Sequence, residues 1–231
     1  MTPREHVLSI LRAETERGRQ VSIGASNMSN GCTYCLARDM VGNPQPQSIY
    51  YLGARIGTAI HEYLEANNPT PDTVLGEQKV IVGEIPGYGT VKSTTDAFFT
   101  ESGVCADWKT TTREKLKWIK LAVQDEPNEY ETTKVVEARA KVSSYQRQVW
   151  LYGRGLENAG HKVESCAIVF ICRDGLTDAD VWEFQFPYSR KQADATFDRA
   201  VRLWEHLQSG NDVESLKSSP TCWTCSFNGR S

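Results

Sequence analysis

The sequence predicts an α/β fold in which a central mixed sheet is flanked by helices. Segments with apolar residues at helical spacing alternate with short β-branched and aromatic segments that glycines bound. Their order is helices, three strands, a helix, two strands and a helix, which suits a layered α/β arrangement. The chain shows no internal repeat and no clean linker, so the 231 residues predict a single domain.

The elements follow from local signals. Thr2-Pro3-Arg4-Glu5 is a capping box that opens a short amphipathic helix, and a polar loop is expected over 22–31. Prolines at 69 and 71 close a second helix over about 49–67. Strands are expected at 77–82, 90–99, 104–108, 163–172 and 181–186, with a hairpin turn at Glu101-Ser102-Gly103. A third helix is expected over 138–159, and Ser189 caps a last one that Gly210 ends.

Composition limits the function classes. The net charge is −3, so contact with nucleic acid requires a local basic face. The sequence has no run of about 18 apolar residues that could cross a membrane, and its first residues lack the apolar core of a secretion signal. Seven cysteines without such a signal favour a reducing, intracellular (cytoplasmic) setting, where paired cysteines more often bind metal than form disulfides.

Two carboxylates and a lysine carry the chemistry that we expect. Asp107 and Lys109 are two residues apart on one strand, so both point to the same face, and a bend or bulge could bring Asp96 to them. Trp108 would then point to the opposite face, toward the core. Two carboxylates on one face favour a hard cation such as Mg²⁺ or Mn²⁺ between them. Taken alone, however, an Asp-x-Lys pair on a strand is more often a surface ion pair.

Four motifs in chain order resemble the PD-(D/E)XK nuclease superfamily. The sequence is most similar to its RecB-like branch, which includes CRISPR-associated iron–sulfur exonucleases and AddB-type nuclease domains. The matching motifs are Gly57-Thr58-Ala59-Ile60-His61 followed by Glu62, Asp96 in Ser93-Thr94-Thr95-Asp96, Asp107-Trp108-Lys109, and Tyr145, Gln148 and Tyr152 as Y-x-x-Q-x-x-x-Y.

The resemblance implies a PD-(D/E)XK restriction-endonuclease-like core and a role for each matched residue. His61, Asp96, Asp107 and the Trp108 carbonyl would bind the divalent ion, and Lys109 would be the catalytic lysine. Gln148 and Tyr152, one helical turn apart, would brace Lys109 or contact DNA. Each residue alone has an ordinary structural interpretation. Glu77 is a further acidic candidate near the site, or a charge at a strand edge.

Two CxxC pairs, Cys32/Cys35 and Cys222/Cys225, predict one four-cysteine metal site that joins the two ends of the chain. Both pairs are expected in turns. The spacing favours zinc, whereas the family resemblance implies an iron–sulfur cluster, [4Fe-4S], although those relatives place one cysteine early and three late. Cys105, Cys166 and Cys172 fall on expected strands as core residues.

The charged segment 113–137 is expected to be solvated or mobile. Its basic residues, which interleave with an aromatic one, suit a single DNA strand, with Arg147 and Arg154 adding phosphate contacts. The candidates in this segment are Arg113, Lys115, Lys117, Trp118 and Lys120.

The sequence therefore predicts a metal-dependent DNA exonuclease that acts on single-stranded or end-containing DNA in recombination, repair or spacer processing, with recombination or replication proteins as possible partners. Its parts would be an N-terminal helix and first CxxC (1–48), a nuclease core (49–210) and a C-terminal segment with the second CxxC (211–231). The alternatives are a non-catalytic DNA-binding module with a zinc or iron–sulfur clasp, and a hydrolase of RNA or small molecules.

Overall fold

A five-stranded mixed sheet forms the centre of the protein in a computed structural model, which describes residues 2–12, 22–42, 51–124 and 132–230. The strand order is β1-β2-β3-β4-β5, in which β3 and β4 run parallel and all other neighbours run antiparallel. The predicted fold class is confirmed. The strands are β1 (Val74–Ile85), β2 (Gly89–Phe99), β3 (Val104–Thr111), β4 (Ser165–Cys172) and β5 (Val181–Pro187).

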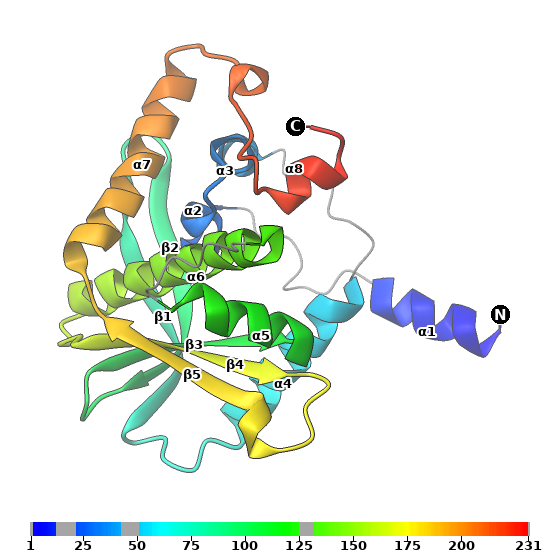
Figure 1. The fold of residues 1–231 in the computed structure, drawn as a ribbon. Helices are drawn as coiled ribbons and strands as arrows, with labels where there is room; N and C mark the ends of the chain where they lie inside the picture. The colour runs from blue at the N-terminus through cyan, green and yellow to red at the C-terminus, as the bar shows by residue number, and fades with distance from the viewer. Residues whose placement is uncertain (1, 13–21, 43–50, 125–131, 231) are drawn as a thin grey trace.

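Helices flank this sheet (Figure 1). The long α6 crosses one face beside α5, while α7 runs along the far part of the β1–β2 hairpin. None of the described helices has the length and apolar character that crossing a membrane requires. The helices are α1 (Pro3–Arg12), α2 (Ala25–Ser29), α3 (Thr33–Met40), α4 (Tyr51–Ala66), α5 (Arg113–Ala122), α6 (Thr133–Asn158), α7 (Arg190–Gln208) and α8 (Trp223–Phe227).

The main core lies between the sheet and α6, because the central strands carry almost continuous apolar sequence. Ile168 and Phe170 of β4 are fully buried, as are Val149 and Leu156 of α6. Burial of large apolar side chains like these is the dominant favourable contribution to folding. The three strand cysteines, Cys105, Cys166 and Cys172, are buried as predicted.

The β1–β2 hairpin pairs with the rest of the sheet over only part of its length. β2 pairs with β3 only from Ala97, opposite Ala106, to Phe99, opposite Val104. Beyond Ala97 the hairpin continues as a two-stranded ribbon whose residues Val82 and Val91 are buried in the main core. The later half of β3 therefore has β4 on one side and no β2 partner on the other.

Three local predictions need correction. The expected loop over 22–31 contains α2, because Asn27 accepts a hydrogen bond from the Gly24 amide and Met28 is buried. The described parts of the charged segment, residues 113–124 and 132–137, are largely helical: Thr112 caps α5, and α6 begins at Thr133, five residues before the expected start. Charge at these positions marks the exposed faces of helices whose apolar residues face the core.

One more difference concerns the two cysteine pairs. Cys32 and Cys222 are not in turns but immediately precede α3 and α8, which contain Cys35 and Cys225. The expected start of the second helix at 49 lies outside the described residues. The predicted hairpin turn at 101–103 is confirmed, and its Gly103 has φ +67°, a conformation that favours glycine.

Candidate active site and cysteine cluster

The end of β3 that lacks a β2 neighbour carries the Asp-x-Lys pair. Asp107 and Lys109 share a face of the strand as predicted, and Lys109 Nζ lies 2.5 Å from Asp107 Oδ2. The Asp107 side chain is only 1% exposed, so this is a buried ion pair and not the surface pair that isolated motifs suggest. Trp108 points to the other face, where it packs on a small cluster of Ala97, Ala106 and Ala167.

The peptide groups of Trp108 face the gap that β2 leaves. The Trp108 amide donates to Asp96 Oδ2 at 2.7 Å, so a side chain of β2 replaces the missing backbone partner. The Trp108 carbonyl oxygen lies 3.1 Å from His61 Nε2, and His61 Nδ1 lies 3.2 Å from Asp96 Oδ1. Three groups that the sequence analysis expected to bind one ion, namely the His61 imidazole, the Asp96 carboxylate and the Trp108 carbonyl, thus contact one another.

Helix α4 can bring His61 close to this gap because the face of the helix that carries His61 also carries two glycines. Gly53, Gly57 and His61 recur every four residues, so they lie on the same face of the helix. A Cβ atom at Gly57 would lie 3.4 Å from Thr110 Oγ1 of β3. A larger residue there would push the helix away from the strand and carry His61 with it.

Glu77 of β1 completes the group. Ligand atoms of His61, Glu77 and Asp96 all lie within 4.8 Å of one another. Glu77 has φ +46°, the only positive φ of a non-glycine residue among those the structure describes. Such strain costs about 1–3 kcal/mol and concentrates at functional sites. The sequence marked Glu77 only as a further candidate, because a left-handed glutamate in a strand leaves no sequence signal.

The electrostatics of this site favour a cation. Burial raises the pKa of Asp107 to about 6, against the opposing effect of Lys109. The hydrogen bond with Asp96 raises the pKa of His61. Apart from its ion pair with Lys109, the buried Asp107 Oδ2 receives no hydrogen bond. A buried carboxylate whose Oδ2 contacts only a lysine, beside an oxygen- and imidazole-lined group, fits a hard divalent ion.

Helix α6 supplies the aromatic and amide residues of the fourth motif. The Tyr145 ring centroid lies 5.1 Å from Lys109 Nζ, which is within the range of a cation–π interaction. Gln148 Nε2 donates to Tyr152 Oη at 2.5 Å, and both side chains are buried. It is therefore Tyr145 that contacts the lysine, while Gln148 and Tyr152 form a pair of their own one turn further along the helix.

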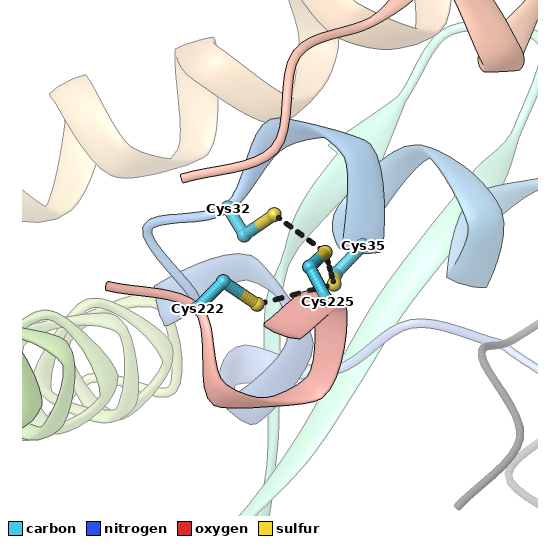
Figure 2. Close-up of side chains that lie close together, drawn as sticks. All are labelled: Cys32, Cys35, Cys222 and Cys225. Carbon is cyan, nitrogen blue, oxygen red and sulfur yellow. Dashed lines mark hydrogen bonds between the residues drawn. The ribbon is translucent and has the colours of Figure 1, made fainter. Parts of the chain in front are cut away.

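The two CxxC pairs meet in one cluster, as Figure 2 shows. The Sγ atoms of Cys32 and Cys225 are 3.6 Å apart, and Cys35 Sγ lies 3.5 Å from Cys222 Sγ and 3.4 Å from Cys225 Sγ. The neighbouring Cys32 sulfur and burial raise the pKa of Cys35, and burial raises that of Cys225 to about 12. The predicted junction between the two ends of the chain is therefore present as a four-cysteine cluster that could bind a metal ion.

Polar contacts hold the same segments together. Glu214, which precedes α8, accepts hydrogen bonds from Tyr34 at 3.0 Å and from Arg230 at 2.6 Å. Arg147 of α6 donates to the Ser29 carbonyl at 2.9 Å, and Arg199 of α7 donates to the Met28 carbonyl at 2.7 Å. Both arginines therefore brace the C-terminal end of α2, shortly before Cys32.

The remaining basic candidates are spread over α5 and its neighbours. Arg113 pairs with Asp180 at 3.0 Å, and Lys120 lies over the ring of Trp182. Trp118 is flanked by Lys117 and Lys134, each 5.3 Å from its ring centroid. Arg147 and Arg154 both make contacts within the fold, the latter with Asp194 at 2.8 Å. A DNA-binding role for these residues stays a prediction.

Comparison with solved structures places the fold. An alkaline exonuclease from Laribacter hongkongensis superposes with a TM-score of 0.51 and 10% sequence identity, covering 86% of this chain and 92% of that one. A phage-related exonuclease from Haemophilus somnus 129PT gives 0.52 and 11%, covering 83% and 97%. The chain has the PD-(D/E)XK fold. No protein-family model and no curated protein matches the sequence, so the likeness at this identity establishes the PD-(D/E)XK fold alone.

Proposed function

We propose that the protein is a divalent-metal-dependent DNA nuclease. The observation that carries the proposal is the convergence, at the gap between β2 and β3, of His61, Glu77 and Asp96 within 4.8 Å, beside the buried pair of Asp107 and Lys109. A structural ion pair needs neither the imidazole nor the strained glutamate. An imidazole and a carboxylate are both ligands that a divalent metal ion can use.

The chain's own groups have distinct roles in this proposal. His61, Asp96, Asp107 and the Trp108 carbonyl would bind the ion, with Glu77 as a further carboxylate. A bound Mg²⁺ or Mn²⁺ would supply polarisation of the phosphoryl oxygen and a water of lowered pKa. Lys109 is held by Asp107 and the Tyr145 ring, so its ammonium is positioned to neutralise charge on the phosphate or to exchange a proton with the attacking water.

Exonuclease action on DNA ends, of the RecB-like type, is the finer part of the proposal. It is supported by the four motifs in chain order and by the names of the solved structures that share the fold, both of them exonucleases. Recombination, repair and spacer processing are the settings in which such an activity would be used.

The test is hydrolysis of end-labelled single- and double-stranded DNA with Mg²⁺ or Mn²⁺, in linear and in circular form. Wild type should degrade linear DNA, and Asp107→Ala and Lys109→Ala should each lose about a thousandfold in rate or more. Asp198→Asn, which changes an exposed carboxylate of α7, is the matched control and should leave the rate unchanged. Equal trace activity in all four proteins would exclude the enzyme. DNA binding without hydrolysis would favour the non-catalytic module.

For the four-cysteine site we propose a single tetrahedral zinc ion with a structural role. Zinc bonded at about 2.3 Å to four sulfurs separates those sulfurs by about 3.8 Å, and three of the observed separations are 3.4–3.6 Å. A [4Fe-4S] cluster, which the family resemblance implies, places four irons and four sulfides among the thiolates and would require the cysteines to move apart.

Metal analysis of anaerobically purified protein tests this assignment. One zinc per chain and no visible absorption is the expected result, whereas iron, acid-labile sulfide and a brown colour would establish the cluster instead. Cys225→Ser should lose the metal and lower the free energy of unfolding by several kcal/mol, because metal binding at a site that joins both chain ends is coupled to folding. Cys172→Ser, a buried strand cysteine outside the site, should keep the metal.

A further inference from the structure

One face of α6 points a row of side chains toward β3. Lys141, Tyr145, Gln148 and Tyr152 are spaced by four, three and four residues, so they form one stripe along the helix. The last three belong to the Y-x-x-Q-x-x-x-Y motif. Lys141 lies one turn before that motif and has no part in the nuclease chemistry proposed above.

The Tyr145 ring has two ammonium groups beside it. Lys109 Nζ and Lys141 Nζ each lie 5.1 Å from its centroid. An aromatic ring attracts each cation, but the cations repel each other. Bringing a second positive charge so close to the lysine of the candidate site is favourable only if negative charge is supplied to both.

Lys109 already has a negative partner and Lys141 has none among the residues that the structure describes. Lys109 pairs with Asp107, and Lys134, two turns before Lys141 on α6, pairs with Glu114 at 3.1 Å. Lys141 instead faces further positive charge. Surrounding protein atoms lower its pKa, and Lys109 and Lys115 of α5 lower it further.

We propose that Lys141 binds a backbone phosphate of the DNA strand next to the phosphate that lies at Lys109. The proposal rests on the nuclease function above and adds a phosphate subsite to it. Lys141 is an exposed residue, so an incoming strand can reach this part of α6. One phosphate would lie at each of the two lysines beside the Tyr145 ring, so the strand would run along α6.

A different role for Lys141 is neutralisation of the cysteine cluster, because Cys222 also lies near enough to affect it. The two roles predict different results. A lysine that serves the cluster changes metal content when it is replaced, whereas a lysine that serves DNA changes only the affinity for the strand.

The first measurement is the binding of a fluorescein-labelled oligothymidylate, with Ca²⁺ in place of Mg²⁺, at several salt concentrations. Lys141→Gln should bind about tenfold more weakly at low salt, and the slope of log affinity against log salt should become shallower by about 0.7, the contribution of one phosphate contact on a single strand. Lys162→Gln is the control, since Lys162 is 87% exposed and pairs with Glu164 at the far end of α6. It should bind as wild type does.

The second measurement replaces single phosphates of the oligonucleotide by neutral methylphosphonates, one position at a time. One position next to the scissile phosphate should weaken binding to wild type and to Lys162→Gln but not to Lys141→Gln, because the variant has already lost that contact. The metal content of Lys141→Gln should equal that of wild type.

The outcomes distinguish failure of the phosphate subsite from failure of the nuclease function. If wild type cleaves DNA and Lys141→Gln keeps the wild-type salt slope and methylphosphonate profile, the phosphate subsite is wrong while the nuclease stands. Loss of the cluster metal in Lys141→Gln would also overturn the subsite and assign the residue to the cysteines. If wild type neither binds nor cleaves DNA, the nuclease itself is refuted.

Discussion

Replacement of Asp107 by asparagine should make the protein more stable when no divalent ion is bound. Asparagine has the shape of the protonated acid, so Asp107→Asn keeps the packing of β3 and removes only the buried charge. The pKa of Asp107 rises from 3.8 to about 6 because the carboxyl is buried. At about 1.4 kcal/mol per pKa unit, ionised Asp107 therefore costs the folded protein about 3 kcal/mol.

The sign and the pH window follow from that pKa. A group whose pKa is raised by folding contributes stability below its unfolded pKa and loses it as pH rises through the folded value. For Asp107 the loss extends from about pH 4 to a little above pH 6. The variant should exceed wild type by about 1 kcal/mol at pH 4.5 and by about 3 kcal/mol at pH 8.

The assay is urea unfolding of both proteins at these two pH values. The buffers are depleted of divalent ions but contain no strong chelator, so that the cysteine site keeps its metal. Asp198→Asn is the control, and its difference in unfolding free energy from wild type should not grow between pH 4.5 and pH 8. Adding Mn²⁺ at about a hundred times its Kd should then stabilise wild type by about 2.7 kcal/mol and leave Asp107→Asn unchanged. A variant that is less stable than wild type at pH 8, or a gap that does not widen with pH, would refute the reasoning.

Two further results are expected. Mn²⁺ affinity, measured by calorimetry, should tighten about a hundredfold per pH unit below pH 6, because binding there releases one proton from Asp107 and one from His61. It should tighten about tenfold per unit from pH 6 to the raised pKa of His61 and flatten above it; an affinity independent of pH would exclude these ligands. Gly155→Ala should lower the free energy of unfolding by about 1–3 kcal/mol, because its Cβ would lie 2.6 Å from Val80 Cγ2. In the same denaturation experiment Gly76→Ala, whose Cβ meets nothing within 4 Å, should lower the free energy of unfolding by less than half as much.

The sequence alone determined the fold class and the order of the main elements, and it predicted most residues of the candidate site. Alternating apolar positions and turn residues are local signals, so the strands, the hairpin at Gly103 and the helix that carries Gln148 could be placed without any tertiary information. Chemistry-bearing residues at fixed spacing, such as Asp107 and Lys109 or the two CxxC pairs, are local signals as well. The structure brings each of these sets together.

Only the tertiary structure decided how the site is assembled. The gap that β2 leaves beside Trp108 depends on where two strands stop pairing, and no local pattern encodes that point. At the same gap the Trp108 peptide contacts Asp96 and His61, and Glu77, which lies near both side chains, has a left-handed conformation. The prediction that the charged segment after Thr112 is solvated or mobile was wrong, because charged residues indicate only that one face is exposed. A helix such as α5 is stabilised by the contacts of its buried face. The role of Lys141 likewise became visible only when Tyr145 and Lys109, distant in sequence, were found beside it.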